Sequence, residues 1–292
     1  MSLDSMKEIF ERMAQEKKPF WEIVLEDDMD ARQVTRNQSM AKMLTIWQAM
    51  VDAADSYTGQ RRSLSGLVGG DGMKMRQYCI RGEAMSGGYV SEVIAEALSM
   101  AESNACMRRI VAAPTAGACG VLPAVLLPLC KYEELNQHQL LEALYVASGI
   151  GSVIAYRACI AGASGGCQAE IGTASAMAAG ALVALRGGSG AQIGHAVAMA
   201  LKNLMGLICD PVAGLVEVPC VKRNVIGAVN AVSVADMALA GVESRIPVDE
   251  VIDAMGEVGR RMPVEVRETA LGGLAVTPTG RAVKQRMHQP IL

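Results

Sequence analysis

The sequence predicts an all-α protein, a single compact helical domain with Gly- and Pro-rich loops. Apolar residues recur at three- and four-residue steps in several long segments, the spacing of one face of an α-helix, whereas alternating strand patterns are scarce. The composition, with 51% hydrophobic and only 3% aromatic residues, favours closely packed helices of small side chains. No repeat, linker or shift in composition divides residues 1–292, so we expect one domain.

The first half of the chain is expected to contain a looser N-terminal arm followed by three helices. The arm is placed at residues 1–30. The first helix is predicted over residues 30–56, with Asp30 as its N-cap, because five apolar residues follow helical spacing there: Met40, Met43, Leu44, Trp47 and Val51. Two more helices are predicted, one over residues 91–101 and one from Asn136 onwards.

The second half is expected to contain four helices. Two are rich in Ala, Met and Leu and are separated by the breaker Gly187-Gly188-Ser189-Gly190, so they are expected to be buried and to meet at a tight turn. The predicted ranges are 168–185, 191–207, 224–240 and 249–258.

Composition argues against nucleic-acid and membrane partners. The net charge is −3, and Lys and Arg are scattered without a basic stripe. The uncharged run from Ile110 to Cys130 is long enough to suggest a membrane span, but it contains Pro114, Pro123 and Pro128. We therefore expect a protein that binds neither nucleic acid nor membrane.

The eight cysteines occur without a cleavable signal peptide, which indicates a reducing, cytoplasmic environment. Three of them lie in loops. Cys167 follows a glycine-rich segment directly before a predicted helix, Cys209 follows a helix, and Cys220 ends the next loop. Thiolates on irregular backbone suit a soft iron-sulfur cluster, and three ligands would leave one iron open to substrate. From spacing alone, ordinary buried cysteines explain the pattern equally well.

Four long segments resemble the alpha chain of bacterial iron-sulfur L-serine dehydratase, in the order found in that family. They are SLSGLVGGDG at 63–72, APTAGACGVLPAVL at 113–126, GASGGCQAEIGTASAMAAGAL at 162–182 and GLICDPVAGLVEVPCVKRN at 206–224. The resemblance covers nearly the whole chain and is far more specific than a single short motif.

This resemblance implies that Cys167, Cys209 and Cys220 hold a [4Fe-4S] cluster and that the fold is all-helical. It also implies the reaction, which is loss of water from L-serine and conversion of the product to pyruvate and ammonia, a step of amino-acid degradation. No PLP is needed, because the cluster supplies the electrophile. The remaining cysteines are interpreted as packing residues.

Two segments are candidates for binding the carboxylate and ammonium of serine: Ser63, Ser65 and Gly66 in the first, and Thr115, Ala116 and Gly117 in the second. Hydroxyls and exposed amides at a helix start bind carboxylates. Turn formation and helix capping are the alternative roles. Asp71 is a further candidate partner for the ammonium, although an Asx turn explains it almost as well.

The chain offers little choice of a general base. His138 and His288 are most simply solvated residues, and His195 in a predicted buried helix is more typical of a hydrogen-bonded core histidine. In the family that the chain resembles, a beta subunit or fused domain carries a serine-rich loop with a histidine, which this sequence lacks. We therefore expect an alpha subunit of a homo- or hetero-oligomer that is weakly active or inactive alone. The tail ends Gln289-Pro290-Ile291-Leu292, so the cysteine tail of single-chain relatives is not expected.

Two other functions stay open at this point. One is a lyase similar to cysteine desulfidase, in which sulfide leaves in place of water. The other is a non-catalytic, metal-binding regulatory protein. Substrate preference separates the first from a serine dehydratase, and metal loading without any response to substrate would indicate the second.

Overall fold

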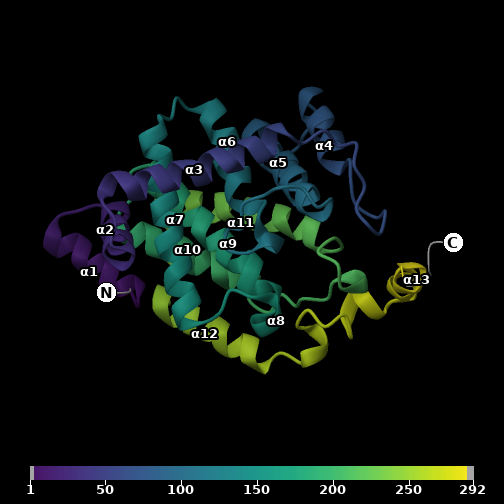
Figure 1. Ribbon diagram of the computed structural model, residues 1–292. Helices are drawn as coiled ribbons and strands as arrows, with labels where there is room; N and C mark the ends of the chain where they lie inside the picture. Colours follow the sequence, from purple (N-terminus) through teal and green to yellow (C-terminus); the bar gives the residue numbers. More distant parts are fainter. Residues whose placement is uncertain (1–2, 288–292) are drawn as a thin grey trace.

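The computed structural model describes residues 3–287 and confirms the all-α prediction (Figure 1). The helices are α1 (Met6–Glu16), α2 (Phe20–Arg32), α3 (Arg36–Asp55), α4 (Asp71–Ile80), α5 (Gly87–Ala105), α6 (Val121–Tyr132), α7 (Gln137–Arg157), α8 (Gly162–Gly165), α9 (Thr173–Leu185), α10 (Gly190–Leu204), α11 (Cys220–Leu239), α12 (Val248–Arg261) and α13 (Pro278–Met287). Five short helical turns are η1 (Ala116–Ala118), η2 (Gln168–Gly172), η3 (Val212–Gly214), η4 (Val264–Val266) and η5 (Gly273–Val276). Within the described residues the only extended pairing is an isolated parallel bridge between Cys209 and Arg267.

The centre of the fold is α9, which packs against α7, α10 and α11 (Figure 1). Every residue from Thr173 to Val183 is buried, and most are Ala, Gly or Ser. Such small side chains let helix axes approach closely. A methyl group at Gly227 of α11 would lie 2.9 Å from Ile171 and 3.0 Å from Val121, so this contact requires glycine. The small-residue composition is therefore a packing requirement of the core.

Capping residues set the observed helix starts. Asn136 and Ser189 each form a capping box with a Gln three residues later, which confirms the predicted start of α7. The predicted start at Asp30 was wrong. Asp30 lies inside α2, which ends with Gln33 in the left-handed region, and α3 begins after Thr35, which forms its own capping box.

The described part of residues 1–30 is not a looser arm but two helices, α1 and most of α2. Met6 and Ile9 of α1 and Ile23 of α2 are completely buried in the main core. The α1 start is tied to α12, because Asp249 accepts hydrogen bonds from the Met6 and Lys7 amides at 2.9 and 3.0 Å. Both helices therefore belong to the domain.

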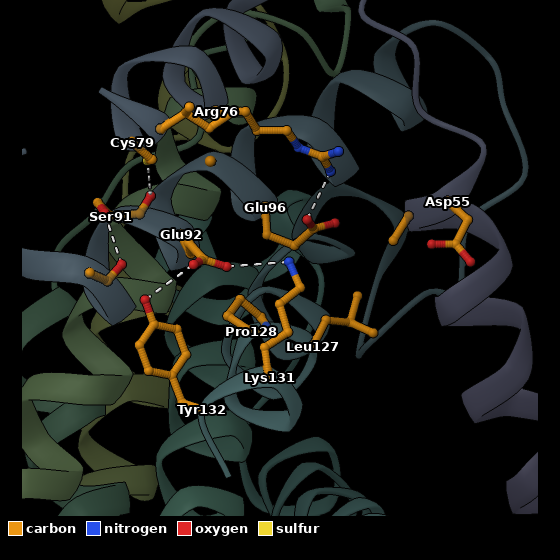
Figure 2. Close-up of a pocket in the computed structure, with 14 residues that line it drawn as sticks. Asp55, Arg76, Cys79, Ser91, Glu92, Glu96, Leu127, Pro128, Lys131 and Tyr132 are labelled. Carbon is orange, nitrogen blue, oxygen red and sulfur yellow. Dashed lines mark hydrogen bonds and ion pairs between the residues drawn. The ribbon is translucent and has the colours of Figure 1, made fainter. Parts of the chain in front are cut away.

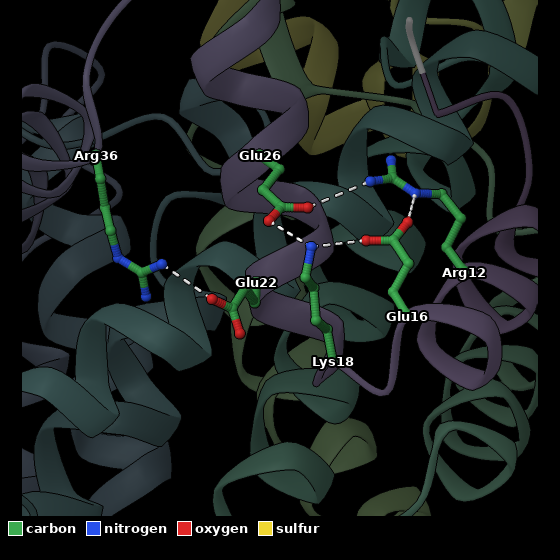
Figure 3. A network of polar contacts seen from close by, with 6 residues as sticks. All are labelled: Arg12, Glu16, Lys18, Glu22, Glu26 and Arg36. Atoms are coloured by element: carbon green, nitrogen blue, oxygen red, sulfur yellow. Dashed lines mark hydrogen bonds and ion pairs between the residues drawn. The ribbon is translucent and has the colours of Figure 1, made fainter.

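A network of ion pairs joins α1, α2 and α3 at the surface (Figure 3). Its pairs are Arg12–Glu16 at 2.8 Å, Arg12–Glu26 at 3.4 Å, Lys18–Glu16 at 2.8 Å, Lys18–Glu26 at 2.7 Å and Arg36–Glu22 at 2.9 Å. These side chains are about a quarter to a half exposed, so solvent screens the pairs and each adds little to stability. The burial of apolar residues of α1 and α2 in the main core therefore contributes more to holding these helices in place than the ion pairs do.

The uncharged run from Ile110 to Cys130 contains the short turn η1 and then forms most of α6. Among the described residues, one helix, α7, is long and apolar enough to cross a membrane, and α6 is too short. Two thirds of its apolar window, 67%, is buried against the rest of the protein, as in the core helix of a soluble protein.

Ile23→Ala tests whether α2 belongs to the core. The Ile23 side chain is fully buried, and its truncation removes apolar contacts and leaves a cavity. The free energy of unfolding should therefore fall by about 2–5 kcal/mol. Urea denaturation measures this change. Asp30→Ala, at an exposed position of the same helix, is the control and should change stability by about 0.5 kcal/mol or less. Equal, small effects of both substitutions would contradict the packing of α2.

Candidate active site

The three predicted cluster cysteines lie in segments that meet at one end of the helical bundle. Cys167 is between α8 and η2, Cys209 is in the loop after α10, and Cys220 is the first residue of α11. All three are buried, with exposed fractions of 1%, 2% and 7%. The element η2 is a π-turn, a rare conformation that occurs frequently at functional sites.

The segment that carries Cys167 is held by its neighbour Gln168, which is itself buried. The Gln168 amide donates to the Leu207 carbonyl at 2.9 Å, and its side-chain oxygen accepts from the Gly206 amide at 2.7 Å. Its side-chain nitrogen donates to the Met255 carbonyl at 3.0 Å. One glutamine thus joins the Cys167 segment, the Cys209 loop and α12.

Cys209 is fixed by the segment that follows α12. Its amide donates to the Val266 carbonyl, and its carbonyl accepts from the Glu268 amide, each at 2.8 Å. The next residue, Asp210, accepts a hydrogen bond of 2.8 Å from the Leu274 amide. Residues more than 50 positions away in sequence therefore set the position of this thiol.

The cysteine thiols influence one another and lie beside a cation. A hydrogen bond with Cys209, together with the nearby Arg223 guanidinium, lowers the pKa of Cys167 despite its burial. The same hydrogen bond raises the pKa of Cys209. Burial, followed by the charge of Cys167, raises the pKa of Cys220 to about 12. The arrangement favours a thiolate at Cys167, the form that binds metal.

Arg223 also connects two of the cysteine-bearing segments through a hydrogen bond and an ion pair. Its guanidinium donates to the Ile208 carbonyl at 2.7 Å and to the Asp210 carboxylate at 2.8 Å, in an ion pair whose side chains are 14% and 3% exposed. Arg223 therefore connects the start of α11 to the loop that carries Cys209.

Glu170, which the sequence analysis did not single out, completes this group. One carboxylate oxygen of Glu170 and the sulfur atoms of Cys167 and Cys209 all lie within 4.8 Å of one another. Oε1 accepts a hydrogen bond of 2.8 Å from the Thr115 hydroxyl. Burial raises the pKa of Glu170, and nearby Glu268 adds to the rise.

The candidate segment Thr115-Ala116-Gly117 lies directly beside this group. Thr115 contacts Glu170, and the Gly117 carbonyl accepts a hydrogen bond of 2.8 Å from buried Asn224. Asn224 also accepts from the Gly120 amide at 2.9 Å and donates to the Cys220 carbonyl at 3.0 Å. Asn224 therefore fixes the second candidate segment to the start of α11.

The other candidate segment, Ser63, Ser65 and Gly66, is attached to the loop between Cys209 and Cys220. The Ser63 hydroxyl donates to buried Glu217 at 2.6 Å, and the Ser65 hydroxyl donates to the same carboxylate oxygen. Gly66 has a φ of 77°, so it has the turn role that the sequence left open. Both serine hydroxyls are thus engaged within the protein.

Other candidates lie away from the cysteines or have partners. Asp71 forms ion pairs with Lys74 at 2.9 Å and Lys222 at 2.6 Å. His195 accepts a hydrogen bond from the Ser244 amide and lines a different cavity, of about 860 Å³, between α1, α10 and the loop before α12. His138 pairs with Glu142 at the surface. His288 and the C-terminal residues 289–292 lie outside the described residues.

A second cavity, of about 600 Å³, lies between α3, α4, α5 and α6 (Figure 2). It contains the Arg76–Glu96 ion pair and the Lys131–Glu92 ion pair. Of the eight cysteines, which are all free, only Cys79 lines it. Neither of these two cavities therefore includes the group formed by Cys167, Cys209 and Glu170.

The fold and this group together define an all-helical protein with buried thiols and a carboxylate that can hold a metal. Comparison of the sequence with family models identifies the family. The model of the serine dehydratase alpha chain matches residues 15–275, and the chain belongs to this family.

Relatives in several bacteria agree with this assignment. The probable L-serine dehydratase alpha chain of Bacillus subtilis is 43% identical over 287 residues, covering 97% of this chain and 94% of that protein. The L-serine dehydratase alpha chain of Peptoniphilus asaccharolyticus is 39% identical and covers 97% of each chain. The L-serine dehydratase of Helicobacter pylori is 35% identical over 94% of this chain, but the match covers only 61% of that protein.

Sequence reasoning missed the polar partners Glu170 and Glu217. Glu170 follows Cys167 by three residues at a helix start, a spacing that places both on one face and could have identified it. Glu217 gave no such local signal, because its partners Ser63 and Ser65 are more than 150 residues away.

Asn224→Ala tests how the second candidate segment is held. The substitution leaves the buried Gly120 amide and Gly117 carbonyl without partners, so the free energy of unfolding should fall by about 2–4 kcal/mol. Chemical denaturation provides the measurement. Asn37→Ala, at an exposed position in the first turn of α3, is the control, with an expected change of about 0.5 kcal/mol or less. A loss no larger than that of the control would contradict the bracing role of Asn224.

Proposed function

We propose that the chain is the alpha subunit of an iron-sulfur L-serine dehydratase. The reaction removes the α-proton and the β-hydroxyl of L-serine as water, and the resulting aminoacrylate tautomerises and is hydrolysed to pyruvate and ammonia. Membership of the alpha-chain family and the names of full-length relatives support this activity. The observation that carries the proposal is the close approach of the buried Cys167 and Cys209 thiols to each other and to Glu170, with Cys220 near enough for the charge of Cys167 to raise its pKa.

The residues present fit a [4Fe-4S] cluster held by Cys167, Cys209 and Cys220. Their thiols are soft donors on irregular or helix-starting backbone, and the Arg223 guanidinium offsets negative charge beside them. When bound, such a cluster supplies a Lewis-acidic iron without a protein ligand, which assists departure of the serine hydroxyl. The fit of the donor set supports this cofactor.

The protein segments around the cysteines are proposed to bind and orient the substrate. The segment Thr115-Ala116-Gly117 lies beside Glu170, which is close to the Cys167 and Cys209 sulfur atoms, so this segment is proposed to form one border of the substrate site. Ser63 and Ser65 are held through Glu217 to the loop between two cysteine ligands, so the Gly66 turn is proposed to form another border. For these serine hydroxyls to contact the substrate directly, their hydrogen bonds to Glu217 would have to break.

A beta subunit is the proposed source of the general base. Among residues 3–287, both histidines lie elsewhere: His195 lines another cavity, and His138 is at the surface. Relatives of similar length are named alpha chains, whereas the longer Helicobacter pylori protein matches this chain over 61% of its length. This difference in length is consistent with a second polypeptide that completes the enzyme.

Cys167→Ala tests the proposed ligand set. Loss of one thiolate should reduce bound iron and acid-labile sulfide after anaerobic reconstitution and should abolish the visible charge-transfer absorption. Cys130→Ala, at a half-buried position in α6, is the control and should load as the wild type does. If the Cys167 variant bound as much iron and sulfide as the wild type, Cys167 would not be a cluster ligand and would be a packing residue instead.

The need for a partner is tested by comparing turnover of the reconstituted chain alone and with a serine dehydratase beta chain. Because the base is expected on the partner, pyruvate formation from L-serine should rise at least about 100-fold on mixing, the contribution typical of a general base. Equal rates would refute the need for the beta chain. Parallel assays with L-cysteine measure sulfide release, and a preference for cysteine would indicate a desulfidase instead.

A further inference from the structure

Glu170 is a mostly buried carboxylate without a cationic partner among the described residues. Its polar neighbours include the Thr115 hydroxyl, which donates to Oε1, and Glu268, whose charge is of the same sign. Asp210, the residue after Cys209, pairs instead with Arg223, and buried Glu217 accepts hydrogen bonds from two serine hydroxyls. Burying an uncompensated charge is costly, so an isolated carboxylate in such a place requires an explanation.

Two glycines pack closely against the carboxylate of Glu170. A methyl group at Gly162 would lie 3.0 Å from its Oε2 and 3.1 Å from the sulfur of Cys209. A methyl group at Gly117 would lie 3.1 Å from its Oε1. Any larger residue at either position would therefore crowd the Glu170 carboxylate, so both positions favour glycine.

The position suits one particular group of the substrate. The ammonium and the hydroxyl of serine are on adjacent carbon atoms, so a site for the ammonium must lie immediately beside the site where the hydroxyl is activated. A Glu170 oxygen lies within 4.8 Å of the Cys167 and Cys209 sulfur atoms, which meets this condition. A charge-assisted hydrogen bond from an ammonium would supply the missing positive charge.

We propose that Glu170 binds the α-ammonium of the amino-acid substrate and thereby determines that the enzyme accepts amino acids in preference to hydroxy acids. This inference rests on the proposed dehydratase function. In it, Thr115 is a positioning residue, because its hydroxyl holds Oε1 and directs Oε2 toward Gly162 and the thiols. Binding the ammonium in turn fixes the Cα–Cβ bond of serine relative to the hydroxyl-activating centre.

Glu170 could instead be a metal ligand, since its oxygen lies near two thiols. A hard carboxylate is a poorer match than a thiolate for an iron-sulfur cluster, and Cys220 supplies a third thiol. The two roles differ in one measurable respect. A ligand variant loses iron and sulfide, whereas an ammonium-site variant keeps both.

The experiment compares L-serine with 3-hydroxypropanoate, which has the hydroxyl and carboxylate but lacks the amine. Equilibrium dissociation constants are measured by calorimetry on the reconstituted chain without the beta chain, so that L-serine is not turned over during the titration, and iron and sulfide content are measured on the same samples. In the wild type, L-serine should bind at least about tenfold more tightly than 3-hydroxypropanoate. Glu170→Gln should weaken L-serine binding at least about tenfold and change 3-hydroxypropanoate binding less than about threefold, with metal content unchanged.

Two further variants sharpen the outcome. Glu170→Asp keeps the charge and should retain part of the preference for the amine. Glu134→Gln, at an exposed position between α6 and α7, should leave both constants unchanged. Equal weakening of both ligands by Glu170→Gln, loss of iron and sulfide, or a wild type without preference for the amine would overturn the proposal. A wild type that binds L-serine with this preference but neither loads iron nor forms pyruvate would instead contradict the dehydratase function and leave the role of Glu170 in place.

Discussion

The ion pair between Arg223 and Asp210 is the interaction on which the cysteine end of the protein depends. Arg223 belongs to α11, whereas Asp210 follows Cys209. Asp210 also accepts a hydrogen bond from the Leu274 amide in the C-terminal segment. The pair thus joins three parts of the chain, and the same guanidinium lies beside Cys167. Because both side chains are largely buried, removing either partner would leave an uncompensated charge at a cost of about 3–5 kcal/mol.

The helical core makes this arrangement possible by bringing distant segments to one place. Small residues on α9 and α11 allow close packing, so η2, the Cys209 loop and the start of α11 meet at the end of the bundle. Glycines serve the site in the same way. Gly162 and Gly117 leave space beside Glu170, and Gly273, with a φ of 57°, lets the backbone approach Asp210 closely. Packing and site geometry therefore impose the same preference for small residues.

Much of the fold could be predicted from local sequence patterns, but the polar contacts of the site could not. Helical periodicity and the Asn136 cap located α7, and the glycine breaker separated α9 from α10. The N-terminal helices were missed because their apolar faces are short and interrupted by charged residues, and only packing on the core shows that they are buried. The Thr115–Glu170 contact spans 55 residues and the Ser63–Glu217 contact spans 154, so neither leaves a periodic signal.

The most direct test of the account is the Mössbauer spectrum of the chain reconstituted anaerobically with ⁵⁷Fe and sulfide, recorded with and without L-serine. Three cysteine ligands on a [4Fe-4S] cluster leave one iron distinct from the other three. The account predicts that L-serine changes the signal of that one iron and leaves the others nearly unchanged. A spectrum without a cluster, or a cluster whose irons are all unaffected by L-serine, would contradict it.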